Sequence, residues 1–115
     1  MIEKELSESK EELVNISMKM ILHAGEARTL MMQVYDLLEE EKFEEAKEKL
    51  KMTHDQIDIS HTYQTGVVQK EANGELIEYS PLFTHAQDIL MTVQAQYVLT
   101  TRIARLFKKL AEKGE

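Results

Sequence analysis

The sequence has no cysteine, one proline and four glycines among its 115 residues. Without cysteine the protein can form neither disulfides nor thiolate zinc sites, and it has no cysteine nucleophile. Aromatic residues make up only 6% of the chain, and the remainder is rich in Glu, Lys, Leu, Met, Ala and Gln. These residues lose little side-chain freedom in a helix, whereas glycine and proline disfavour helix interiors. The composition therefore predicts an all-α protein.

Long apolar runs and an excess of positive charge are also missing. No apolar segment approaches the roughly 20 residues needed to span a bilayer, and the first ten residues, MIEKELSESK, are too charged for a signal peptide. The formal net charge of −7 argues against a nucleic-acid partner, because binding to phosphates requires clustered Lys and Arg. We expect a cytoplasmic protein with a single domain over residues 1–115.

Apolar residues recur at steps of three or four along three segments of the chain. This spacing is typical of amphipathic helices, and it predicts helices over about residues 10–39, 42–71 and 81–113. Ser9 followed by Glu12 fits a capping box at the start of the first helix. Because the connections are short, the three helices are expected to form an antiparallel up-down-up bundle.

The connections themselves carry turn and capping signals of unequal strength. Asn73 and Gly74 are turn residues between the second and third helices. Ser80 followed by Pro81 marks a helix start, since the hydroxyl can cap the helix and the proline ring fixes the first helical φ. The boundary between the first two helices has no glycine or proline, only the acidic segment EEEK over residues 39–42.

The third helix has two apolar faces, of which a three-helix bundle can bury only one. One face is expected to form the core, with Leu82, Ala86, Ile89, Leu90, Val93, Tyr97, Ala104 and Phe107. The second face, called the outer stripe below, consists of Met91, Ala95, Val98, Leu99 and Leu106. A monomer would leave the outer stripe in water, and such a stripe usually marks a partner surface. The simplest partner is another copy of the same helix, which predicts a homo-oligomer.

Two polar residues of the third helix lie at or beside the outer stripe. Asp88 lies within it, and a lone carboxylate there is costly unless it is paired, protonated or bound to a cation. Copies of Asp88 that meet near a symmetry axis could share a divalent cation such as Mg²⁺; the alternative is an ordinary exposed aspartate. His85 lies at the border between the core and the outer stripe, where it is either a reactive group or a hydrogen-bonded packing residue.

Three segments of the chain resemble one known protein family. HAQDILMT over residues 85–92 closely resembles the HAQDHLMT signature of the lactose/cellobiose-type IIA components of the bacterial phosphoenolpyruvate-dependent sugar phosphotransferase system. HAGEAR over residues 23–28 is similar to the AGxAR segment of that family, and SHTYQTGVVQKEA over residues 60–72 is similar to its AHxxQTxLIxxEA segment. The resemblance covers nearly the whole chain after the first ten residues.

The resemblance implies a function, partners and an assembly. His85 matches the family's phosphorylated histidine, which accepts a phosphoryl group from the carrier protein HPr and passes it to a cysteine of the IIB component. The protein would then be a phosphotransferase component of enzyme class 2.7 that needs no organic cofactor and contacts the membrane only through the IIC component. The family fold is a homotrimer joined through the third helix, with the matches of Asp88 meeting at the axis, where a metal ion can sit. His61 and Gln64, on the inward side of the second helix, and Gln87 are expected to support His85.

Two other functions remain possible from the residues alone. Asp58 with His61 and His85 with Asp88 are pairs three positions apart that could bind a metal ion from facing helices. The chain could also be a structural adaptor in which His85 only packs. The sugar is not defined by the sequence, because lactose, cellobiose, chitobiose and aryl β-glucosides all fit the family. Ile89 stands where the family more often has histidine.

Overall fold

A computed structural model describes residues 2–114, apart from the side chains of residues 6 and 7. It contains three helices, α1 (Ile2–Glu39), α2 (Phe43–Ala72) and α3 (Pro81–Lys113), and no strand among the described residues. The prediction of an all-α three-helix bundle is confirmed. Met1 and Glu115, the two ends of the expected domain, lie outside the described residues.

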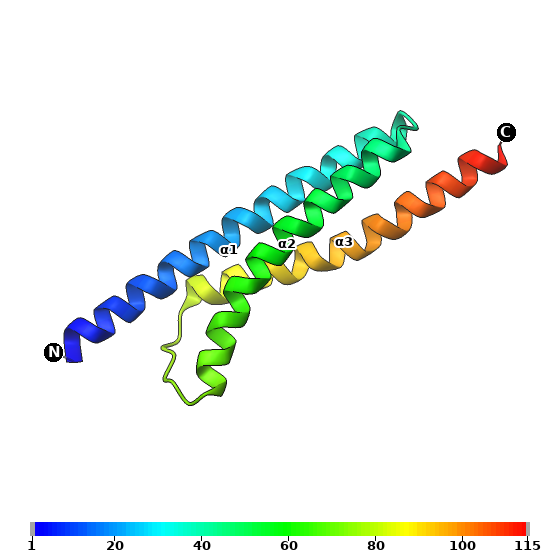
Figure 1. The fold of residues 1–115 in the computed structure, drawn as a ribbon. Coiled ribbons are helices and arrows are strands. Elements are labelled where there is room, and N and C mark those ends of the chain that lie inside the picture. The colour runs from blue at the N-terminus through cyan, green and yellow to red at the C-terminus, as the bar shows by residue number, and fades with distance from the viewer. Residues whose placement is uncertain (1, 115) are drawn as a thin grey trace.

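The helices lie side by side in an elongated bundle of 70 × 21 × 19 Å. Figure 1 shows that α1 and α2 run antiparallel, and that α3 then runs in the same direction as α1. The turn between α1 and α2 therefore lies at the same end of the bundle as the C-terminus of α3 (Figure 1). The start of α3, which carries His85, lies towards the opposite end.

α1 begins earlier than the sequence predicted. The helix includes residues from Ile2 onward, so Ser9 lies inside it, and the expected capping box at Ser9 is wrong. The early residues are good helix formers without glycine or proline, so nothing local stops the helix before residue 10. An ion pair of 3.3 Å between Lys10 Nζ and Glu78 Oε1 also joins this part of α1 to the connection before α3.

α1 ends in a tight turn that leads into α2. The N–H of Glu41 donates to the carbonyl of Leu38 at 3.0 Å, and the N–H of Lys42 donates to the carbonyl of Leu37 at 2.9 Å. This is the Schellman arrangement, in which one residue adopts a left-handed conformation. Glu41 takes that conformation with a φ of 56°, although it is not glycine. The predicted boundary between these two helices is confirmed, but without a glycine the sequence did not indicate which residue takes the left-handed conformation.

The second connection uses the turn residues that the sequence indicated. Gly74 has a φ of 93°, and its N–H donates to the carbonyl of Glu71 at 3.0 Å. At the start of α3, the Ser80 hydroxyl accepts a hydrogen bond of 3.1 Å from the N–H of Phe83, and Pro81 occupies the first helical turn. The predicted cap is confirmed, and it sets the position at which α3 begins.

The core is built from small and medium-sized side chains at the centre of the bundle. Its main cluster consists of Met20, Ala24, Ala27, Met31, Ile57, Ala86, Leu90 and Val93. The expected core face of α3 is correct up to Ala104, with one addition: Thr100 is buried and bonds to the Tyr35 hydroxyl at 2.7 Å. Phe107 was expected in the core but is 49% exposed, because it lies beyond Ala104, the last residue of α3 that packs against a buried core cluster.

Candidate functional site

His85 lies in the second turn of α3, and its side chain is exposed to solvent. The next residue, Ala86, is completely buried against α1 and α2. The backbone that carries the imidazole is therefore held in the core while the ring stays accessible. This arrangement suits a group that must meet a large partner.

Two glutamines join α2 and α3 beside His85. The side-chain amide Nε2 of Gln64 donates to Oε1 of Gln87 at 3.0 Å, and both side chains are half-buried. Gln87 is only two positions after His85, so this hydrogen bond ties the backbone near His85 to the neighbouring helix. Two of the three residues that were expected to support His85 are thus brought together.

His61 does not take the inward position that was predicted. Its side chain is exposed, and its Nδ1 lies 3.3 Å from the hydroxyl of Thr65, one turn further along the same helix. Ser60, the preceding residue, occupies the buried position, where its hydroxyl donates to the carbonyl of Met20 at 2.9 Å. Because adjacent residues of a helix point in different directions, burial of Ser60 turns His61 towards solvent.

The other histidines are engaged within the bundle. Nδ1 of His23 lies 2.7 Å from Oε1 of Gln56, and the His23 ring stacks on Tyr63 with a centroid distance of 6.4 Å. His54 forms a 3.4 Å contact with Asp58 and packs against the ring of Tyr97. Sequence analysis did not identify these contacts, although His23 and Tyr63 lie inside the two supporting motifs.

The outer stripe of α3 is exposed in the single chain, as the sequence predicted. Met91 is 57% exposed and Leu99 is 62% exposed. Asp88 is also exposed, and none of the ion pairs within residues 2–114 involves it. A single chain thus presents Asp88 as one carboxylate among exposed apolar side chains.

The structure does not support the metal-binding alternative. Within residues 2–114, no group of three or more His, Cys, Asp or Glu side chains is placed to hold a metal ion. Asp58 pairs with His54 on its own helix instead of joining His61 to the pair on α3. A metal at Asp88 would need ligands from other copies of the chain.

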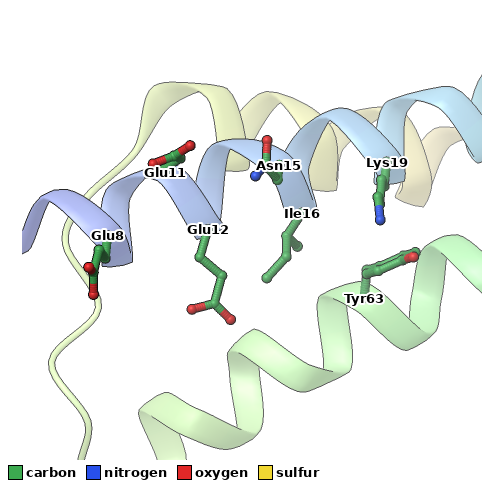
Figure 2. A pocket seen from close by; sticks show the side chains of 7 residues that line it. All are labelled: Glu8, Glu11, Glu12, Asn15, Ile16, Lys19 and Tyr63. Atoms are coloured by element: carbon green, nitrogen blue, oxygen red, sulfur yellow. The ribbon is translucent and has the colours of Figure 1, made fainter. Parts of the chain in front are cut away.

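Two grooves lie at the N-terminal half of α1. The smaller one, of about 390 Å³, is lined by Glu8, Glu11, Glu12, Asn15, Ile16, Lys19 and Tyr63. Figure 2 shows Lys19 above the ring of Tyr63, and its Nζ lies 5.6 Å from the ring centroid. The larger groove, of about 810 Å³, lies between α1, the end of α2 and the connection before α3. His85 lines neither of these two grooves, and its side chain is exposed.

The sequence around this site is shared with a known protein family. The family described as "PTS system, Lactose/Cellobiose specific IIA subunit" matches residues 15–108. The chain belongs to this lactose/cellobiose-specific IIA family of the sugar phosphotransferase system. All the candidate site residues discussed above lie inside the matched range.

Individual members of the IIA family are similar over most of their length. The chain is 34% identical to the lichenan-specific phosphotransferase enzyme IIA component of Bacillus subtilis (strain 168), over 90% of this chain and 94% of that protein. It is 30% identical to the lactose-specific EIIA component of Lacticaseibacillus casei, over 90% and 93%. The crystal structure of the cellobiose-specific enzyme IIA from Bacillus anthracis superposes with a TM-score of 0.81 at 35% identity, over 86% of this chain and 91% of that one.

The IIA family assignment identifies the chain as a component of a sugar phosphotransferase system for lactose/cellobiose-type sugars. Within residues 2–114, no helix is both long enough and apolar enough to cross a membrane. The match to the family confirms the resemblance that the sequence motifs indicated.

Proposed function

We propose that the protein is a cytoplasmic phosphoryl carrier that accepts a phosphoryl group on His85 from phosphorylated HPr and passes it to the cysteine of a IIB component. The group then phosphorylates a β-linked disaccharide that enters through the membrane component IIC. The names of relatives that act on lichenan, lactose and cellobiose favour a sugar of this class. The single observation that supports the proposal most strongly is the exposed His85 at the start of the HAQD motif.

The proposed transfer has two displacement steps at phosphorus. A ring nitrogen of neutral His85 attacks the phosphorus, the N–P bond to the histidine of HPr breaks, and that imidazole leaves with the bonding electron pair. In the second step the thiolate of IIB attacks, the N–P bond of His85 breaks, and an S–P bond forms. No oxidant or further co-reactant is required. The chain contributes mainly the position of His85 and its electrostatic surroundings.

The surroundings of His85 favour an added negative charge. His85 lies near the N-terminus of α3, where the partial positive charge of the helix dipole interacts favourably with a phosphoryl group. The hydrogen bond between Gln64 and Gln87 limits movement of α3 against α2. We assign Gln64 and Gln87 as positioning residues, because their amides bond to each other.

The proposal is tested by phosphorylation with phosphoenolpyruvate, enzyme I and HPr, followed by intact mass spectrometry. We expect wild type to gain one acid-labile phosphate and His85→Gln to gain none while its helical circular dichroism is unchanged. His61→Gln and His54→Gln are matched controls and should still be phosphorylated. Phosphate on the His85→Gln protein would refute the assignment.

We further propose that the chain forms a homotrimer through the outer stripe of α3. Burial of Met91, Val98 and Leu99 against the same residues of other copies would remove apolar surface that a single chain leaves in water. A stable monomer in sedimentation equilibrium at micromolar concentration would contradict this assembly.

The trimer would bring three Asp88 carboxylates close to its axis. Oxygen ligands suit a divalent cation such as Mg²⁺, and the exposure of Asp88 in the single chain leaves its carboxylate available for such contacts. A bound cation there would offset the repulsion between the carboxylates. The cation would have a structural role, since Asp88 lies within the outer stripe whereas the transfer proceeds at His85.

A further inference from the structure

The last turns of α3 are basic, partly apolar and free of the bundle. Ala104 is the last residue of α3 that packs against the buried core clusters, and every residue from 105 to 110 is exposed. Between residues 102 and 113, called the basic end below, the only carboxylate is Glu112. The cations of the basic end are Arg102, Arg105, Lys108, Lys109 and Lys113. Its exposed apolar residues are Leu106, Phe107 and Leu110.

Nothing within the described chain compensates this charge. The ion pairs within residues 2–114 lie elsewhere, and none uses a cation of the basic end. Leu106 is 58% exposed and Leu110 is 67% exposed, so this part of the helix also gains little from burial. A short helical segment without tertiary packing is only marginally stable in water. The basic end is therefore a surface that lacks its partner.

A surface of opposite charge lies at the turn between α1 and α2. This acidic tip consists of Asp36, Glu39, Glu40, Glu41, Glu44 and Glu45, all exposed, with Lys42 as the one cation among them. Glu40 raises the pKa of Lys42 above its usual value by accepting a hydrogen bond and by charge attraction, and Glu45 adds to the attraction. Lys42 is thus already neutralised, and the other carboxylates of the acidic tip retain an excess of negative charge.

The two surfaces lie at the same end of the bundle but do not pair within one chain. Figure 1 shows the C-terminal end of α3 and the α1–α2 turn at one end, with the basic end diverging from the other two helices. In an assembly with a three-fold axis along α3, symmetry makes all copies parallel. The acidic tip of one copy is then at the same height as the basic end of its neighbour.

We infer that the basic end of each α3 docks against the acidic tip of a neighbouring copy of the same chain. The inference rests on the proposed homotrimer and names the contacts that close it. The exposed Leu106 continues the outer stripe and supplies an apolar contact beneath the charges. Each copy carries both a basic end and an acidic tip. Three such contacts therefore close a ring in which every basic end and every acidic tip is paired.

Two other occupants compete for the basic end. An anionic membrane would attract its cations, but the adjacent acidic tip and the net charge of −7 oppose approach of the whole protein. An antiparallel dimer would instead place the basic end beside the acidic start of α1 in the partner, which includes Glu3, Glu5 and Glu8. Both alternatives are outcomes of the experiment below.

The test is a charge swap followed by sedimentation equilibrium at several salt concentrations. Arg105→Glu with Lys109→Glu reverses the basic end, and Glu39→Lys with Glu41→Lys reverses the acidic tip. The second pair is placed at the C-terminus of α1, where a cation suits the helix dipole, so the monomer should remain folded. Each pair alone should weaken trimer association by at least about tenfold, and all four changes together should restore it to within about threefold. The control is Lys4→Glu with Lys51→Glu, which changes the net charge by the same amount as Arg105→Glu with Lys109→Glu. It should have little effect on trimer association.

The outcomes separate this inference from the proposals on which it depends. A wild-type monomer overturns both the trimer and the docking, whereas phosphorylation of His85 in the same samples tests the carrier function independently. If neither charge reversal weakens the trimer, only the docking is refuted. The same holds if the four changes together do not restore association. Rescue by reversing Glu3 and Glu5 in place of Glu39 and Glu41 would identify the antiparallel dimer. Loss of binding to phosphatidylglycerol vesicles, with the trimer unchanged, would identify a membrane surface and refute the inference.

Discussion

The hydrogen bond between Gln64 and Gln87 allows a quantitative test of how His85 is positioned. Gln64→Leu removes the donor and leaves Oε1 of Gln87 without the partner that it has at 3.0 Å. A buried acceptor without a partner costs about 1–3 kcal/mol. Gln87 is half-buried, so water replaces part of the bond, and we expect a cost near the lower limit, about 1 kcal/mol.

The double variant should behave differently from either single variant. Gln64→Leu with Gln87→Leu removes both polar groups and leaves two apolar side chains in contact, which is nearly neutral for stability. Since each single variant is expected to lose about 1 kcal/mol and the double variant almost nothing, the coupling energy in a double-mutant cycle should have a magnitude of about 2 kcal/mol. With an unfolding entropy of about 2.1 cal/mol/K per residue, 115 residues give about 240 cal/mol/K, so each kcal/mol changes Tm by about 4 °C.

The assay combines thermal melting by circular dichroism with the rate of phosphoryl transfer from phosphorylated HPr. Protein concentration must be held constant, because oligomer melting depends on it. Each single variant should melt about 4 °C lower than wild type and transfer phosphate more slowly, by up to about tenfold, because His85 is less well placed. Gln69→Leu, which changes an exposed glutamine of the same helix, is the control. If the double variant is as unstable as the sum of the single variants, the two amides are not coupled and the positioning argument is wrong.

Two further predictions concern assembly and the backbone. Asp88→Leu should raise the Tm of the oligomer and abolish any effect of magnesium or chelator on it, because repulsion between carboxylates is removed; a lower Tm would mean that Asp88 makes a favourable contact. Gly74→Ala should lower the Tm by about 4–8 °C, since a left-handed residue with a side chain costs about 1–2 kcal/mol. An added Cβ at Gly74 meets nothing within 4 Å, so the φ of 93° is the sole cause of this cost, and an unchanged Tm would refute the argument.

The position of the turn between α1 and α2 was predicted correctly, but residue types did not identify the residue that adopts its left-handed conformation. Patterns of residue type identify left-handed positions by their glycine, as at Gly74. Glu41 adopts the same conformation because the helix-ending hydrogen bonds of Leu37 and Leu38 hold it there. α1 continues before Ser9 because its early residues include neither glycine nor proline, so a serine with a glutamate three positions later did not mark a helix start here.

The sequence by itself determined the three helices, the start of α3 at Ser80 and the two apolar faces of α3, because these depend on spacing and side-chain type along one helix. The motif around His85 also determined the family. Only the tertiary structure decided that Gln64 meets Gln87 while His61 points to solvent, since these depend on how α2 is rotated against α3. It also decided that Phe107 is exposed, because a helical pattern continues whether or not another helix is present to cover it.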